Sequence, residues 1–175
     1  MKLGVIVPQG WTGELDALEV ISRMLEGDRT VHASYDGDHH SVDGARNVPK
    51  PIQANGMPIM VGGNGPKVTW RLAARYADEL NLDGLSPDEV RAAFPVIRSR
   101  CEEIGRDPDS LAISVHVWSG MPEWRAAGSD RRRLLADDAE AGVARCIGLL
   151  QSSADTDQAL DDLAVDARSA GVELA

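Results

Sequence analysis

The feature that most constrains the fold is the stretch from residue 58 to residue 78, PIMVGGNGPKVTWRLAARYAD, in which an apolar run breaks into a glycine-rich turn. The apolar residues at 59–61 predict a short buried strand, and the amphipathic sequence after the turn predicts a helix. Short apolar runs alternate with amphipathic segments along most of the chain. This alternation predicts an α/β fold with a parallel sheet and right-handed crossovers.

Helix boundaries are well marked at several points. The first expected helix has apolar residues on one face between 15 and 25 and stops at Gly27. The best-marked helix starts with a capping box of Ser86 and Glu89, has Pro87 at its first position, and should bend at Pro95. We expect later helices at 130–141 and 156–170, and strands at 3–7, 59–61, 79–82, 111–118 and 145–150.

Residues 28–53 form a polar excursion that interrupts the alternation. Short strands at 30–33 and 40–42, separated by turn-forming residues, predict an exposed hairpin. Three of the four histidines fall in this segment. Adjacent His39 and His40 would point to opposite faces of a strand, so they could not hold one ion together without distortion. We therefore predict no metal site.

Composition limits the classes of protein that remain. The chain of 175 residues, 43% hydrophobic, predicts a single α/β domain over residues 1–175, and its net charge of −10 argues against binding to nucleic acid. Acidic residues follow the basic cluster 131–133, which predicts a solvated helix face. Cys101 and Cys146 lack metal or disulfide spacing, so we expect reduced, mostly buried thiols and a cytoplasmic protein. We see no membrane-spanning run and no signal peptide, and expect no membrane partner.

The glycine-rich turn has two interpretations. Gly62, Gly63 and Gly65 can bring backbone N–H groups close to a ligand, Pro66 suits the first position of a helix, and Lys67 adds an ammonium group. With the positive end of the helix dipole, these residues would bind a phosphate. An ordinary strand-to-helix loop explains the same residues equally well.

Spacing excludes two familiar phosphate motifs. A P-loop needs Ser or Thr directly after Gly-Lys, but Pro66 separates Gly65 from Lys67, and Val68 follows the lysine. A dinucleotide fingerprint beginning at Gly63 would need a glycine at position 68. The turn therefore belongs to neither class.

His116 is the histidine outside the polar excursion. It alternates with Ser114 and Trp118 on one face of an apolar strand, near the carboxyl end, which is the ligand side of a parallel sheet. A hydrogen-bonded core histidine is the more common interpretation of such a residue. We retain His116 as a candidate for the substrate pocket.

Several motifs in order along the chain resemble the luciferase-like monooxygenases, and most closely the branch that uses the deazaflavin coenzyme F420. They are VIVPQGW after the first strand, DGARNVPKPIQ in the hairpin, PIMVGG at the next strand, and RLAARYADELN before the capped helix. The resemblance implies a TIM barrel with reduced F420, or alternatively FMN, at the carboxyl face. It also implies that Gln9 and Trp11 line the ring or substrate pocket. The implied phosphate-binding residues are Gly62, Gly63, Asn64, Gly65, Pro66 and Lys67.

The chain departs from that family between Trp11 and Leu15, where three βα units carrying strands two to four are absent. In the family, the loops of these three units carry much of the cofactor contact and the usual catalytic side chains. TIM barrels generally need about 200 residues or more, so we expect a TIM-barrel-derived sheet that is partial or open. Its uncovered edges and inner face predict a homo-oligomer.

Three functions remain compatible with the sequence. The first is a flavin- or deazaflavin-dependent oxidoreductase or monooxygenase acting on a small-molecule substrate. The second is a non-catalytic, cofactor-binding or subunit-type remnant of that family, and the third is another α/β enzyme with a phosphate ligand. No nucleophile elbow of the GxSxG type occurs, and the sequence assigns no catalytic residue.

Overall fold

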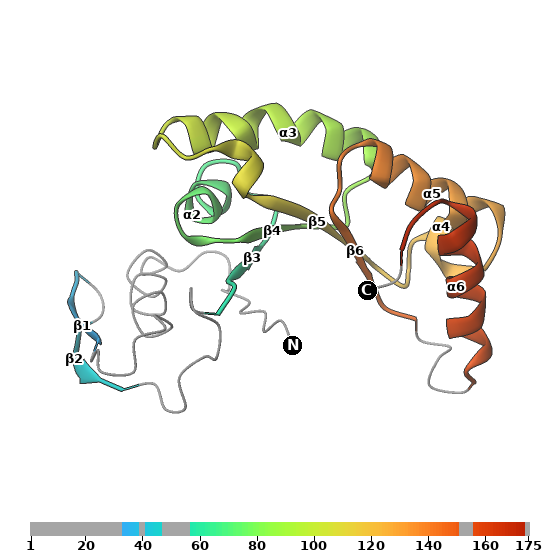
Figure 1. Ribbon diagram of the computed structural model, residues 1–175, viewed down its shortest axis with the longest axis horizontal. Coiled ribbons are helices and arrows are strands. Elements are labelled where there is room, and N and C mark those ends of the chain that lie inside the picture. The colour runs from blue at the N-terminus through green and yellow to red at the C-terminus, as the bar shows by residue number, and fades with distance from the viewer. Residues whose placement is uncertain (1–32, 39–40, 47–56, 151–155, 174–175) are drawn as a thin grey trace. The chain divides into compact units, whose positions relative to one another are not determined.

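The computed structural model describes residues 33–38, 41–46, 57–150 and 156–173. The chain divides into two compact units, residues 1–80 with 100–111 and residues 81–99 with 112–175. Each unit is described separately, and the single domain expected from length stays a prediction. In chain order the elements are β1 Ala33–Asp36, β2 Ser41–Ala45, β3 Met60–Gly62, α2 Thr69–Tyr76, β4 Glu79–Asp83, α3 Pro87–Glu102, η1 Pro108–Ser110, β5 Ala112–Val117, α4 Pro122–Arg125, α5 Ser129–Glu140, β6 Arg145–Gly148 and α6 Gln158–Ser169 (Figure 1).

The main sheet is parallel and has four strands in the order β3-β4-β5-β6. Strands β5 and β6 pair from Ser114 opposite Arg145 to Val117 opposite Gly148. These four strands do not close into a barrel within the part of the chain that the structure describes. The predicted α/β class with an open parallel sheet is therefore confirmed.

Four of the five expected strands are present, with ends that shift by one or two residues. Strand β6 stops at Gly148, two residues before the expected end, and β5 stops at Val117. Apolar composition predicted both strands but does not mark where backbone pairing ends. The expected strand at 3–7 and the expected helix at 15–25 lie outside the described residues.

The predicted hairpin is present, and its described strands extend to Asp36 and Ala45, beyond the expected ends at 33 and 42. Strands β1 and β2 are antiparallel, with Ala33 opposite Ala45 and Asp36 opposite Ser41, and a register shift lies between Ala33 and Tyr35. Gly44 has a φ of 58°, a backbone conformation that glycine adopts without steric cost. His39 and His40, between the two strands, lie outside the described residues.

In the first unit, Arg106 fixes the carboxyl end of α2. Its Nη1 donates to the backbone oxygens of Ala73 (3.3 Å), Ala74 (3.0 Å) and Ala77 (2.7 Å). Carbonyls at a helix end lack helical partners and carry the negative end of the dipole, so a guanidinium stabilises them. The buried apolar side chains of this unit include Ile59, Val61, Trp70, Leu72, Leu80 and Leu111.

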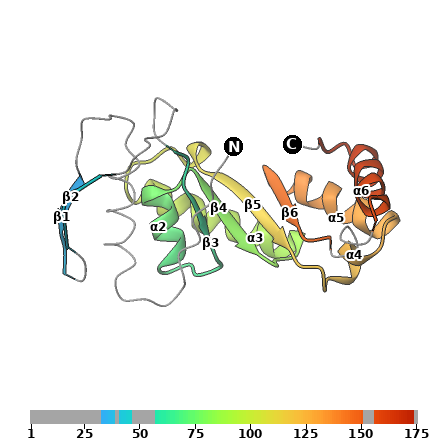
Figure 2. The same ribbon diagram turned by 90° about the horizontal axis from the view of Figure 1, so that it is seen from below.

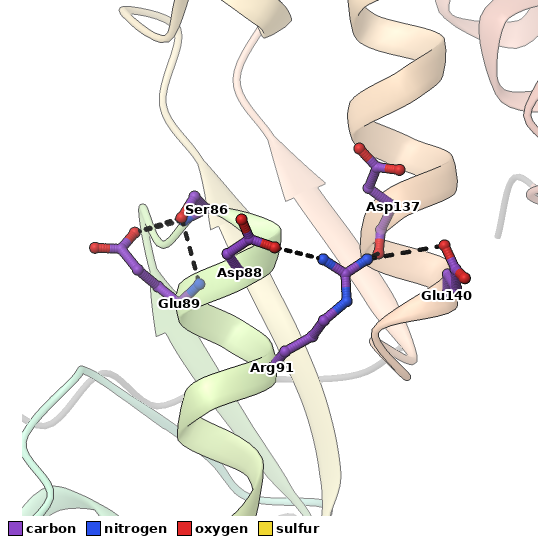
Figure 3. A network of polar contacts seen from close by, with 6 residues as sticks. All are labelled: Ser86, Asp88, Glu89, Arg91, Asp137 and Glu140. Atoms are coloured by element: carbon purple, nitrogen blue, oxygen red, sulfur yellow. Dashed lines mark hydrogen bonds and ion pairs between the residues drawn. The ribbon is translucent and has the colours of Figure 1, made fainter.

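In the second unit, α3 begins with the predicted capping box. Glu89 Oε2 accepts from the Ser86 backbone N–H at 2.9 Å, and Ser86 Oγ accepts from the Glu89 N–H at 3.4 Å (Figure 3). The hydrogen bonds from Ser86 lower the pKa of Glu89. Arg91 joins α3 to α5, donating to Asp88 Oδ1 (2.8 Å) and to the Asp137 carbonyl (3.2 Å).

The prediction that residues 131–133 form a solvated helix face is wrong for Arg131, which is buried in the second unit. Arg131 is 3% exposed, and its Nη1 lies 3.5 Å from Asp166 Oδ2 of α6. Its guanidinium also packs over the Trp124 ring, with 5.4 Å to the ring centre. Mixed charge in sequence did not reveal that α6 supplies a buried carboxylate to this position, whereas Arg132 and Arg133 are exposed as expected. Figure 2 shows α4, α5 and α6 grouped beyond β6.

None of the helices in the described segments has the length and apolar character needed to cross a bilayer.

Candidate functional site

The glycine-rich turn of the first unit joins β3 to α2. Gly63 is buried and has a φ of 131°, which a residue with a side chain rarely adopts. Its carbonyl accepts a hydrogen bond from Trp70 Nε1 at 3.1 Å, and the Gly65 carbonyl accepts from the Trp70 backbone N–H at 3.0 Å. A Cβ on Gly65 would lie 2.8 Å from Thr69 Oγ1. The turn is thus folded tightly against the start of its own helix.

The helix starts later than the sequence suggested. Residues 66–68 form a turn and α2 begins at Thr69, so Pro66 does not occupy the first helical position. The glycine turn was recognisable from composition, but the extra turn before the helix was not, because Pro66 is compatible with both conformations.

The electrostatics at the start of α2 favour an anion. No side chain caps the amino end of this helix, and its first turn contains no acidic residue. The first turn therefore offers the positive end of the helix dipole no acidic side chain of its own, and the carboxylate nearby is Glu103, whose Oε2 lies 3.6 Å from Arg71 Nε. Lys67, one residue before the N-cap Val68, is exposed. A phosphate at this turn would meet backbone donors, the dipole and an ammonium group.

Arg100 is a second cation beside the turn, which sequence reasoning missed. Its Nε donates to the Pro66 carbonyl at 3.1 Å, and its Nη1 pairs with Glu103 Oε1. The side chain is 18% exposed. Arg100 lies 34 residues after Pro66, at the end of α3, so only the fold brings the two together. The contact steadies the turn, while the charge of Arg100 is offset by its ion pair with Glu103.

The second unit carries polar side chains on one face of β4 and β5. Because side chains alternate along a strand, Asn81 and Asp83 share one face of β4, and Ser114 and His116 share one face of β5. Asn81 Nδ2 donates to Ser114 Oγ at 2.8 Å. The opposite faces carry buried Leu82, Val115 and Val117. One face is thus apolar core and the other presents polar groups.

His116 and Asp83 form a pair at the carboxyl ends of their strands. His116 Nδ1 lies 3.2 Å from Asp83 Oδ1, and the two side chains are 27% and 48% exposed. An ionised carboxylate can only accept, so this contact puts the proton of the neutral ring on Nδ1 and leaves Nε2 as the acceptor. The Gly84 backbone N–H also donates to the His116 carbonyl at 2.9 Å, which holds the two strand ends together. An imidazole oriented in this way can exchange a proton with a bound molecule.

The pair settles how His116 is placed, without testing what it does. The histidine is neither fully buried nor part of the apolar core, and sequence reasoning did not foresee Asp83 as its partner. Asp83 lies 33 residues earlier, at the end of the preceding strand of the sheet, and a search for acidic residues after neighbouring parallel strands could have found it.

Two other predicted site residues, Gln9 and Trp11, lie outside the described residues. The described segments contain no group of three or more His, Cys, Asp or Glu side chains arranged to hold a metal ion. Neither cysteine forms a disulfide: Cys101 is buried and Cys146 is half-buried.

Comparison with known proteins identifies the family. The sequence profile of the luciferase-like monooxygenase family matches residues 4–172, nearly the whole chain. The chain belongs to the luciferase-like monooxygenase family. The resemblance seen in the sequence motifs is confirmed.

Solved structures related to this luciferase-like chain have the same fold. An F420-dependent secondary alcohol dehydrogenase in complex with an F420-acetone adduct superposes with a TM-score of 0.62 at 17% identity, over 77% of this chain and 54% of the dehydrogenase. A riboflavin lyase with modified FMN and riboflavin gives 0.61 at 12% identity, over 91% of this chain and 57% of the lyase. The F420-dependent tetrahydromethanopterin reductase from Methanopyrus kandleri has a TM-score of 0.50 at 19% sequence identity. The match covers 91% of this chain and 46% of the reductase.

The luciferase-like chain spans about half the length of these structures. At such identities the likeness establishes a fold of the luciferase-like TIM-barrel type. The open four-stranded sheet agrees with the expectation of a partial barrel.

Proposed function

We propose that this luciferase-like chain binds a reduced deazaflavin or flavin and serves as an oxidoreductase on a small-molecule substrate. The observation that carries the proposal is the β3–α2 turn, where Gly63 has a positive φ and the following helix starts with neither a cap nor an acidic residue. Family membership supports the redox class, because relatives described with F420 and with FMN share the fold.

The cofactor phosphate is held, in this proposal, by Gly62, Gly63, Asn64, Gly65, Pro66 and Lys67. The glycines allow close approach of the backbone, Lys67 supplies a charge, and Arg100 fixes the Pro66 carbonyl from the end of α3. A phosphate fits this turn because the anion would offset the exposed positive end of α2. We favour F420 as the cofactor, with FMN as the alternative.

The bound cofactor would supply the hydride or oxygen chemistry, and the protein would supply position and proton exchange. His116 is the residue of the second unit best placed for proton exchange, because Asp83 fixes its ring and directs Nε2 away from the carboxylate. For Gln9 and Trp11, a role in lining a ring or substrate pocket rests on the sequence resemblance alone.

A second candidate function is that of a non-catalytic, cofactor-binding subunit. The specific observation in its favour is that the chain spans about half the length of its solved relatives, so a complete pocket would need groups from elsewhere. A third candidate, an α/β enzyme with a different phosphate ligand, uses only the glycine turn. We further propose a cytoplasmic homo-oligomer that binds neither nucleic acid nor membranes.

Calorimetric titration with F420 and with FMN tests the phosphate site. Gly63→Val should abolish measurable affinity, because valine disfavours the required φ of 131°. Lys67→Ala should weaken binding about three- to tenfold, the effect of losing one exposed charge on a phosphate. Gly171→Val is a matched control, since Gly171 also has a positive φ (73°) but follows α6 in the second unit.

The results separate the candidates. Cofactor binding lost in Gly63→Val but kept in Gly171→Val, together with turnover, supports the oxidoreductase. Binding without turnover supports the subunit. Wild-type protein that binds inorganic phosphate but neither cofactor supports the third candidate, and unchanged cofactor affinity in Gly63→Val shows that the phosphate is held elsewhere.

A further inference from the structure

Trp118 is a large aromatic side chain that the second unit leaves half exposed. It follows β5 directly, two residues after His116, and 49% of its surface is accessible. Trp124, the other tryptophan of this unit, is only 3% exposed. The exposed ring therefore does not serve the core of its own unit.

The Trp118 ring is nevertheless held in place. A Cβ on Gly84 would lie 3.0 Å from Trp118 Cδ1 and 3.2 Å from Nε1, so the indole packs directly over a position that only glycine leaves open. Gly84 also has a φ of 63°. On another side the imidazole of His116 lies 4.4 Å away between ring centres, tilted by 57°. An exposed aromatic ring with a fixed orientation is preorganised for stacking, because binding costs it little rotamer freedom.

The Trp118 ring has polar neighbours, His116 and Asp83, and an apolar neighbour just after the next strand, Leu149. The pair of His116 and Asp83 lies beside the ring, with Nε2 as the acceptor position of the oriented imidazole. Leu149, 51% exposed, follows β6 directly after Gly148, which pairs with Val117. An aromatic face, an aliphatic neighbour and one oriented hydrogen-bonding nitrogen are the features of a site for a flat ring that bears a hydroxyl group.

We propose that Trp118, His116, Asp83 and Leu149 bind a planar aromatic ring that bears a hydroxyl group, with the ring stacked on the Trp118 indole and the hydroxyl bonded to His116 Nε2. This deepens and rests on the proposed function, since it names the chemical class of substrate for the His116 region. The indole supplies affinity for flat rings, and the pair of His116 and Asp83 selects those with a hydrogen-bond donor.

The test compares two probes that differ in planarity. 1-Naphthol is flat and aromatic, and decahydro-1-naphthol has the same carbon skeleton and hydroxyl group without a π face. Binding to the full chain is followed by calorimetry and by the indole N–H resonances of the tryptophans. We expect 1-naphthol to bind about tenfold more tightly than the saturated alcohol and to shift the Trp118 resonance, the effect of one good aromatic stack.

Variants locate the binding. Trp118→Ala should weaken 1-naphthol binding about tenfold and abolish the preference for the flat probe, and Trp118→Phe should restore most of it. Asp83→Asn should weaken 1-naphthol but leave naphthalene unchanged, because it disturbs the orientation of His116, which naphthalene has no hydroxyl group to contact. Leu160→Ala is the control, since Leu160 on α6 is 51% exposed, as Leu149 is, and plays no part in the proposed site.

Equal affinity for the two probes, or unchanged affinity in Trp118→Ala with the fold intact by circular dichroism, would overturn the proposal. The assay contains no cofactor, so its outcome is separate from that of the proposed function. Ring binding without any cofactor affinity would leave this site standing while the oxidoreductase assignment fails, and the reverse result would remove only this site.

Discussion

Replacing Asp138 by asparagine should stabilise the protein, and the gain should depend on pH. Asp138 of α5 is 2% exposed, and neither carboxylate oxygen has a hydrogen-bond partner within the described structure. Burial raises the pKa of Asp138 from 3.8 to about 6, and nearby Asp137 acts in the same direction while Arg91 opposes it. A buried carboxyl group without a partner favours its protonated form.

The sign and size of the effect follow from the pKa in the two states. The folded protein holds the proton more tightly than the unfolded chain, so this residue costs no stability below pH 3.8 and costs progressively more as the pH rises to about 6. Above that pH the cost is constant, at about 3 kcal/mol when each pH unit is worth about 1.36 kcal/mol. Asn cannot ionise, so Asp138→Asn avoids the cost.

Thermal and urea denaturation of the wild type and of Asp138→Asn between pH 4 and pH 8 measure this difference in stability. We expect nearly equal stability at pH 4 and a gain in Tm of about 6–12 °C at pH 8, since about 3 kcal/mol shifts a chain of this size by that amount. Burial, with a smaller contribution from Asp138, also raises the pKa of the Cys146 thiol to about 12, so alkylation of Cys146 should quicken in Asp138→Asn.

The control is Asp161→Asn, at an exposed position in the first turn of α6, where the change should be small and nearly independent of pH. The reasoning is wrong if Asp138→Asn is less stable than wild type at pH 8, or if its advantage is the same at both ends of the pH range.

Other predictions concern packing, capping, chemistry and assembly. Arg131→Ala should lower the free energy of unfolding by about 3 kcal/mol in urea, because it strips a buried partner from Asp166, whereas exposed Arg132→Ala should cost less than about 1 kcal/mol; equal losses would contradict the burial argument. Ser86→Ala should cost about 1 kcal/mol through the lost cap of α3, and no change in urea midpoint would refute that role. Any turnover should require an added reduced deazaflavin or flavin, so activity without one would exclude the redox proposal. Light scattering should find a dimer or larger oligomer, and a well-folded monomer at high concentration would contradict the predicted assembly.

Much of the architecture could be predicted from sequence because the relevant physics is local. The capping box of Ser86 and Glu89 spans four residues, and backbone geometry brings them together in any helix that starts there. The apolar runs that became β3 to β6 reflect burial, which the side chains themselves express. The glycine turn and the lack of a disulfide were recognisable because both depend on local composition and spacing.

What the tertiary structure decided are contacts between residues distant in the chain. Nothing near Arg131 in sequence indicates that Asp166 pairs with it, and a run of three arginines is normally solvated. Likewise, Asp83 reaches His116 only because their strands share a sheet, and Arg100 reaches Pro66 only because the end of α3 lies beside the glycine turn. Sequence alone determined the four strands of the main sheet and the longer helices of the described segments. Which charges are buried or paired depends on chain packing, because a charge's free energy depends on the solvent and partners that the fold leaves around it.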